Sequence, residues 1–250
     1  MTEPRPHRRI AVVPAYNEEP TVTAVLDRLS GRVDELVVVD DGSTDGTGAA
    51  VRAWLDGRPS ARLLAFERNQ GMSAAYHLAF SELRRRLEAA ELAPDDLVFT
   101  VDADGQHDLG ALAGLEQALL AGRFDAVLAR RDLSGYPALK RAGNWALSRW
   151  ASLWARRRLL DVESGYRIFR LGALADALRY YRGYKYSETV EVAVVLSRLG
   201  YRVSNDVVVP VPVYRSRTRL VDAAIDMAAI PAAAWRVRGA RAAPLARQGR

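Results

Sequence analysis

Short apolar runs alternate with segments of helical periodicity along the first hundred residues of this 250-residue chain. The pattern predicts strands at residues 9–14, 35–39, 61–66 and 97–101, and helices at 20–29, 48–55 and 72–92. After Glu35 the second run is apolar throughout, as in strands that are covered on both faces. A strand, a polar turn and a helix that repeat in this way indicate βαβ units and a parallel sheet.

The second half of the chain continues the alternation less regularly. Helices are expected at 109–121, 174–180, 187–199 and 221–237, and strands at 125–129, within 159–170 and at 203–213. Pro210 and Pro212 indicate that the last strand lies at a sheet edge. We therefore expect one α/β domain over residues 9–220, with helices on both faces of a mostly parallel central sheet. A disordered leader at 1–8 precedes it, and a C-terminal helix and Arg-rich tail at 221–250 follow it.

Polar side chains follow each of the predicted strands. They are Asn17, Glu18, Asp41, Arg68, Asp102 and Asp104. The carboxyl ends of parallel strands meet at one rim, where open α/β sheets bind their ligands. The chain contains neither G-x-G-x-x-G nor G-x-x-x-x-G-K-[ST], so a nucleotide would be held without a Rossmann fingerprint or a P-loop.

Asp102 and Asp104 directly follow the apolar run at 97–101. Carboxylates on alternate positions of an extended segment point the same way and form a doubly negative oxygen site. Mg²⁺ or Mn²⁺ suits such a site and would in turn hold a diphosphate. The alternative is a solvated turn, because Asp and Gly are common in turns.

Charge indicates an anionic partner. The chain carries 36 basic residues against 30 acidic ones, and only Lys140 and Lys185 among the basic residues are lysine. Arginine suits bidentate phosphate binding, although genome composition alone can also produce such a bias. Residues 140–158 contain six basic side chains and no acidic one, and a second Arg-rich segment follows Tyr214. Phosphates, an acidic membrane surface or nucleic acid could satisfy these patches.

Other functions are excluded by what the sequence lacks. It has no cysteine, so disulfides, thiolate zinc sites and cysteine nucleophiles are absent. No secretory signal precedes residue 16, and no window has the eighteen or so uncharged apolar residues that span a bilayer. We expect a cytoplasmic protein without a transmembrane helix.

Five motifs together resemble glycosyltransferase family 2, whose members have the GT-A fold. In family order they are VPAYNE at 13–18, VVDDGSTDGT at 38–47, NQG at 69–71, VDADGQH at 101–107 and SGYRIFR at 164–170. Within the family the chain is most similar to polyprenyl-phosphate sugar transferases of the dolichol-phosphate mannose synthase type. The resemblance covers roughly residues 9–220 and implies a Rossmann-like GT-A sheet.

The resemblance assigns donor-side roles to matched residues. Pro14, Tyr16 and Glu18 would line the nucleotide base and ribose, and Asp41 would hydrogen-bond to one of them. Tyr16 and Pro14 could instead be ordinary turn residues. The divalent metal and the donor diphosphate would be held by Asp102, Asp104 and Gln106.

The remaining roles concern phosphates and the acceptor. Arg130 would face the phosphates, with Lys140 or Arg141 on the acceptor side, although single arginines in so Arg-rich a chain are often solvated surface. Ser164 would lie at the substrate site or shape a loop beneath it. Arg215 would clamp a phosphate from above. Family members usually have a Gly-Ser-Lys-like segment there, whereas this chain has RSRTRL at 215–220 and so lacks the glycine.

The chemistry implied is inverting transfer of a hexose, with mannose from GDP-mannose as the leading example. A metal at Asp102 and Asp104 would neutralise the departing diphosphate. A polyprenyl phosphate is already anionic at pH 7 and needs cations rather than a general base. If the acceptor were a hydroxyl, Glu163, Glu188 or Glu191 would be the first candidates for the base.

A polyprenyl acceptor also requires a membrane. Trp145, Trp150 and Trp154, with their Arg neighbours, are interpreted as one helical face that docks on the anionic inner surface of the cell membrane. An amphipathic core helix is the alternative. Two competing functions remain: the same fold acting on a soluble hydroxyl acceptor, and a non-catalytic protein that binds nucleotide or nucleic acid. Basic charge alone does not explain the carboxylate rim, so a nucleic-acid partner is not expected.

Overall fold

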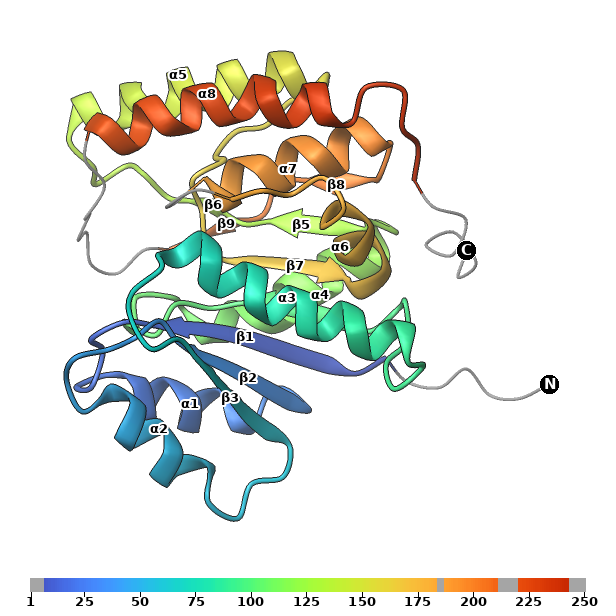
Figure 1. Cartoon of the computed structure of the whole chain (residues 1–250). Coiled ribbons are helices and arrows are strands. Elements are labelled where there is room, and N and C mark those ends of the chain that lie inside the picture. Colours follow the sequence, from blue (N-terminus) through green and yellow to red (C-terminus); the bar gives the residue numbers. More distant parts are fainter. Residues whose placement is uncertain (1–6, 184–186, 211–219, 243–250) are drawn as a thin grey trace.

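Seven strands form the central sheet of the computed structural model, which describes residues 7–183, 187–210 and 220–242 (Figure 1). Their spatial order is β3-β2-β1-β4-β7-β5-β8. The strands are β1 (Arg9–Ala15), β2 (Glu35–Asp40), β3 (Ala61–Ala65), β4 (Leu97–Thr100), β5 (Ala126–Leu128), β7 (Arg167–Arg170) and β8 (Val203–Ser204). Only β7 runs antiparallel to its neighbours β4 and β5. The predicted α/β fold with a mostly parallel sheet is confirmed.

Helices cover both faces of this sheet because its strands are apolar on both sides. Val12 of β1 belongs to one buried apolar layer and Val13 to the other. The first layer includes α3 (Met72–Glu88), α6 (Leu171–Ala177) and α7 (Glu188–Leu199). The second includes α1 (Val22–Ser30), α2 (Thr47–Leu55) and α4 (Leu112–Ala121), which follows the short 3₁₀ turn η1 (Leu109–Ala111). The period-two alternation along the strands thus builds two cores.

Two further helices form an outer layer over α7. They are α5 (Ala138–Ala155) and α8 (Leu220–Arg236), which lie side by side in Figure 1 and contact each other as well as α7. In α8, side chains are described from residue 223 onwards. None of the helices within the described segments is long and apolar enough to cross a membrane.

The strand predicted at 203–213 is wrong as a single element. Its described part forms β8 in the main sheet and β9 (Val208–Val209), which pairs with β6 (Arg130–Arg131) in a separate two-stranded sheet. Asn205 interrupts the run because its side chain accepts the N–H groups of Leu160 and Asp161 at 2.6 and 2.7 Å. The chain therefore leaves the main sheet after two residues.

The predicted leader at 1–8 extends too far. Residues 1–6 lie outside the described segments, but the backbone N–H of Arg8 donates to Asp96 at 2.8 Å. His7 contacts Glu116 at 2.9 Å. These contacts fasten the chain directly ahead of β1.

Candidate functional site

The loop after β4 carries the two aspartates predicted to hold a metal. Thr100, the last residue of β4, donates its hydroxyl to the Gly165 carbonyl at 2.5 Å, which joins this loop to the one before β7. Gly105 has a φ of +75°, a conformation that favours glycine. The turn it makes brings the Gln106 N–H and side-chain amide onto the Asp104 carboxylate at 3.0 and 2.6 Å. The loop therefore closes on Asp104 through Gln106.

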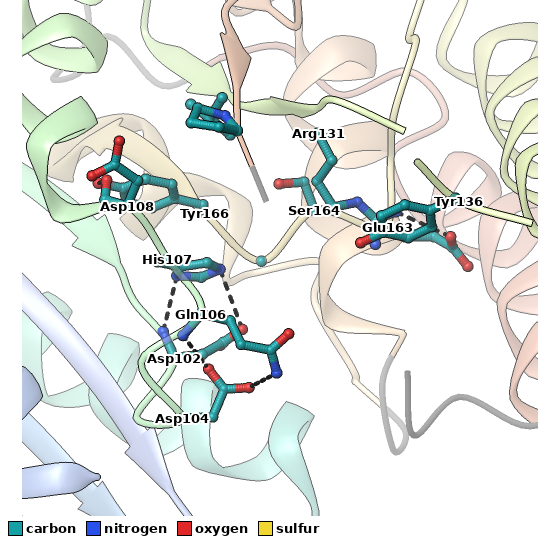
Figure 2. A pocket seen from close by; sticks show the side chains of 13 residues that line it. Asp102, Asp104, Gln106, His107, Asp108, Arg131, Tyr136, Glu163, Ser164 and Tyr166 are labelled. Atoms are coloured by element: carbon teal, nitrogen blue, oxygen red, sulfur yellow. Dashed lines mark hydrogen bonds and ion pairs between the residues drawn. The ribbon is translucent and has the colours of Figure 1, made fainter. Parts of the chain in front are cut away.

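His107 holds the other aspartate of the loop. Its Nδ1 accepts the backbone N–H of Asp102 at 3.1 Å, so the ring hydrogen is on Nε2, which lies 3.4 Å from Asp102 Oδ2. The imidazole stacks on Tyr166, with 4.6 Å between the ring centroids (Figure 2). One side chain thus fixes both the backbone and the carboxylate of Asp102.

These groups face a pocket between the loop after β4, the loop before β7, and the segments around β6 and β9 (Figure 2). Its lining comprises Asp102, Asp104, Gln106, His107, Asp108, Arg131, Tyr136, Glu163, Ser164, Gly165, Tyr166, Val209 and Pro210. Gly165 leaves room for the Asp102 carboxylate, because an added Cβ would lie 3.2 Å from Asp102 Oδ2 and press on it. The structure therefore brings Asp102, Asp104, Gln106 and Ser164 together in the lining of one pocket, and their roles there stay predictions.

The opposite wall is organised around Arg131. Its guanidinium donates to both oxygens of buried Asp161 at 2.8 Å and to Glu163 at 3.2 Å. Burial alone would lower the pKa of Arg131, but the hydrogen bonds and charge of Asp161 raise it overall. Arg131 is thus a fixed cation in the pocket wall, and Glu163 is engaged in an ion pair.

Ser164 is buried, and its Oγ has no hydrogen-bond partner within the described part of the chain. Because buried hydroxyls are nearly always satisfied, such an atom on a pocket wall is available to a ligand. Arg167 and Glu188 lie close by as a fully buried pair, 2.6 Å apart, with Arg167 above the Tyr76 ring. The Tyr76 hydroxyl faces Asp102 Oδ1 at 3.5 Å.

The residues predicted for the nucleotide lie on the adjoining strand ends and do not line this pocket. Pro14 is buried in β1, Tyr16 is exposed after it, and Glu18 is partly buried. Asp41 is buried and accepts the N–H groups of Gln70 and Gly71 at 2.8 and 2.9 Å and the amide of Asn69 at 3.1 Å.

Burial raises the pKa of Asp41 even though backbone N–H groups oppose the shift. Its bonds join the loop after β2 to the loop after β3, so Asp41 shapes this part of the rim. Its predicted contact with base or ribose stays a prediction.

Several other predictions change in the structure. Arg130 does not line the pocket, whereas its neighbour Arg131 does. Lys140 and Arg141 are exposed near the start of α5. Glu188 pairs with Arg167 and Glu191 with Arg236, both within the protein, so neither can serve as a general base. Arg215 lies outside the described residues.

Sequence reasoning gave no site role to several polar and aromatic residues of the lining, among them His107, Arg131, Tyr136 and Tyr166. His107 ends the matched VDADGQH motif, and Tyr166 stands within SGYRIFR, so both could have been found. No pattern in the sequence distinguishes Arg131 from Arg130 or marks Tyr136.

The oxygen-bearing side chains of the pocket fit a hard divalent cation whose remaining coordination positions are filled by a bound substrate. No group of three or more His, Cys, Asp or Glu side chains arranged for a metal occurs in the described segments. Mg²⁺-type sites commonly use only one or two carboxylates and complete their shell with substrate phosphates and water. Asp102 and Asp104 with the Gln106 amide match that pattern.

Comparison with known proteins gives consistent results. The family model described as Glycosyl transferase family 2 matches residues 10–164. The undecaprenyl-phosphate mannosyltransferase of Micrococcus luteus is 31% identical over 211 residues, which cover 78% of this chain and 80% of the relative. The dolichyl-phosphate hexose transferase of Haloferax volcanii is 32% identical over 214 residues, which cover 82% of each chain.

Solved structures share the fold. Glucosyl-3-phosphoglycerate synthase from Mycobacterium tuberculosis, in complex with Mn²⁺, UDP and glucosyl-3-phosphoglycerate, has a TM-score of 0.64 at 20% identity. That match covers 92% of this chain and 80% of the synthase. A mannosyltransferase from Pyrobaculum calidifontis, in complex with GDP-Man and Mn²⁺, has a TM-score of 0.57 at 20% identity and covers 96% and 77%.

Proposed function

This chain belongs to glycosyl transferase family 2, and we propose that it transfers a hexose from a nucleotide sugar to a polyprenyl phosphate, inverting the anomeric carbon. The observation that carries the proposal is one pocket with two dissimilar walls. One wall presents Asp102, Asp104 and Gln106, and the other presents Arg131. The names of the M. luteus and H. volcanii relatives support the acceptor class.

The aspartate wall binds the donor diphosphate. Asp102, Asp104 and Gln106 would hold Mg²⁺ or Mn²⁺, and the Mn²⁺ complexes of two structural neighbours support this. When bound, the cation supplies Lewis-acid neutralisation of the departing nucleoside diphosphate. His107 Nε2 orients the Asp102 carboxylate and Gln106 that of Asp104.

The opposite wall suits an acceptor that needs no deprotonation. Glu163 is paired with Arg131, and Asp108 accepts the Gly110 N–H at 2.9 Å. Both carboxylates of this pocket outside the metal pair are therefore already engaged. A phosphate oxygen is anionic at neutral pH, so cations that position it replace a general base. Arg131 places in this wall a guanidinium that Asp161 and Glu163 already share, and Ser164 Oγ offers a hydrogen bond to a sugar hydroxyl or a phosphate.

The sugar and the location are finer parts of the proposal. Mannose is supported by the name of the M. luteus relative, and GDP-mannose by the ligand of the P. calidifontis structure. Because the phosphate of a polyprenol lies at the bilayer surface, the chain would work as a peripheral protein on the cytoplasmic face of the membrane.

A comparison of three acceptors, each offered separately, tests the proposal. The protein is incubated with Mn²⁺, radiolabelled GDP-mannose and one of three acceptors: polyprenyl phosphate, the matching unphosphorylated polyprenol, or 3-phosphoglycerate. We expect label only in polyprenyl phosphate, with an inverted anomeric centre by NMR. UDP-glucose and UDP-N-acetylglucosamine replace the donor in parallel reactions. Label in 3-phosphoglycerate but not in the lipid would replace the proposal with a soluble-acceptor transferase.

A further inference from the structure

The outer helices α5 and α8 expose an unusual amount of apolar surface. Leu139, Trp145 and Leu153 of α5 are 85%, 66% and 67% exposed, and Trp235 of α8 is 68% exposed. Met227 of α8 is also exposed. These five side chains, here called the α5–α8 face, include most of the large apolar residues that are exposed in the described segments. A concentration of this kind marks a surface that contacts something else.

The tryptophans of α5 divide between this face and the interior. Trp150 donates its indole N–H to the Met227 carbonyl at 3.0 Å and packs edge-to-face on Trp154 at 5.7 Å. Both pack against the buried core, whereas Trp145 points away from it. Five residues of α-helix turn the chain about 140° beyond a full turn, so Trp145 cannot share the face of Trp150. The predicted single face of three tryptophans is therefore wrong, and exposed apolar side chains of two neighbouring helices replace it.

Among the described side chains, the exposed charges on α5 and α8 are of one sign. Residues 138–155 contain no Asp or Glu, and Lys140, Arg141 and Arg149 are all exposed there. Asp226, the acidic residue among the described side chains of α8, is buried. Arg238, just after α8, lies over the Trp235 ring with 5.1 Å to its centroid. Exposed Trp and Leu mixed with Arg and Lys suit the headgroup region of an anionic bilayer.

The face adjoins the pocket. Tyr136 lines the pocket, and α5 begins two residues later at Ala138. Arg131 of the pocket wall also reaches Asn144 on α5 at 3.3 Å. In Figure 1, α5 starts on the side of the molecule toward which β1 points, the side of the pocket. Anything on which the start of α5 docks would therefore lie close to the pocket.

We propose that the α5–α8 face docks on an anionic lipid bilayer, with the apolar side chains among the headgroups and the arginines against lipid phosphates. The biological role of this docking rests on the proposed function, because docking would present the pocket to a polyprenyl phosphate at the membrane surface. The docking itself does not rest on that function for its evidence, which is the composition of the face.

Vesicle flotation tests the docking without any polyprenyl phosphate. Wild-type protein is mixed with phosphatidylcholine vesicles, or with vesicles that contain 30% phosphatidylglycerol, at low and high salt. We expect flotation with the anionic vesicles and a marked loss at high salt. Trp145→Gln with Leu153→Gln, and separately Arg149→Glu, should each lower the partition coefficient roughly tenfold. The matched controls Leu120→Gln on α4 and Arg52→Glu on α2 should float like the wild type.

Other outcomes overturn the inference. Flotation that is equal for the two vesicle types and unaffected by Arg149→Glu would contradict it, as would no flotation at all. A dimer in light scattering that dissociates in the Trp145→Gln, Leu153→Gln variant would assign the face to a second copy of the chain. Binding of Mn²⁺ and nucleoside diphosphate, measured in the same variants, should be unchanged. The flotation result thus stands apart from whether polyprenyl phosphate is the acceptor.

Discussion

Two buried arginine–glutamate pairs lie at opposite ends of the parallel strands, one at their amino ends (the amino edge) and one at their carboxyl ends (the carboxyl edge). The two pairs differ in how many of their polar atoms form hydrogen bonds. At the amino edge, Glu35 accepts two bonds from Arg86 at 2.5 and 2.9 Å and a third from Arg62 at 3.0 Å. At the carboxyl edge, Glu188 accepts one bond from Arg167 at 2.6 Å. There, Arg167 Nε and Nη1 and Glu188 Oε1 have no partner within the described chain.

The difference in hydrogen bonding indicates that one pair mainly stabilises the fold and that the other lies in the region of the functional site. A saturated pair recovers the penalty of burying its charges, whereas an unsaturated one does not. The unsaturated pair lies beside Tyr76, which faces Asp102, and near the pocket where Ser164 Oγ is also unpartnered. We interpret the amino edge as the part that holds the fold together and the carboxyl edge as the part that carries the pocket, where Ser164 Oγ is left for a ligand.

The largest effect is expected for Asp104→Asn. The variant keeps the hydrogen bond to the Gln106 N–H but loses the charge that attracts the cation, so transfer should fall at least about a thousandfold. The melting temperature should stay near that of the wild type. Asp34→Asn at the amino edge, which removes the charge paired with Arg9, is the matched control and should keep full activity.

Arg86→Met should show the reverse behaviour. Removing the arginine leaves the buried Glu35 carboxylate without its bidentate partner, and the free energy of unfolding should fall by about 3–5 kcal/mol. Urea denaturation measures the loss. Per folded molecule, kcat should equal that of the wild type, and a selective loss of kcat would break the division between the two edges.

His107 variants should act on the site by tens of fold. His107→Ala removes both contacts to Asp102, so the KM for Mn²⁺ should rise by about 10- to 100-fold. His107→Gln keeps a donor that can reach the carboxylate and should recover part of the loss. His77→Ala on α3, which removes a ring stacked on Tyr181, is the control. An identical KM in all three variants would remove His107 from the positioning of Asp102.

The smallest effect is expected for the double variant Arg167→Met, Glu188→Leu. Replacing an incompletely satisfied ion pair with apolar side chains should leave the free energy of unfolding within about 1 kcal/mol of the wild type. Transfer should fall a few-fold because Tyr76 loses the guanidinium beside its ring. A loss of stability as large as that of Arg86→Met would show that the two pairs are equivalent after all.

Much of the fold followed from the sequence because the strands β1, β2 and β4 are short apolar runs that end in polar turns. The same regularity placed Asp102 and Asp104 directly after a strand, whereas Gln106 followed only from the resemblance to the family. Where the structure depended on distant contacts, prediction failed. The run at 203–213 was divided by Asn205, whose side chain binds the backbone of residues 160 and 161.

That Arg131 rather than Arg130 lines the pocket has a simple geometric cause. Arg130 and Arg131 are consecutive residues of β6, so they point to opposite sides of the strand. Only the position of Asp161 and Glu163, thirty residues further along, decides which of them faces the pocket. Likewise, Glu188 and Glu191 carry the chemistry of a base, and only the packing of α7 shows that they are buried in ion pairs.

The most direct test of the central claim is calorimetric titration of the protein with GDP and with UDP, in the presence and absence of Mn²⁺. The claim is that Asp102 and Asp104 bind a cation together with a nucleoside diphosphate. We predict that Mn²⁺ tightens the binding of the preferred nucleotide at least about tenfold in the wild type and in Asp34→Asn, and that Asp102→Asn and Asp104→Asn abolish this gain. Nucleotide binding that is equally tight without a metal, or a gain that persists in both aspartate variants, would contradict the account.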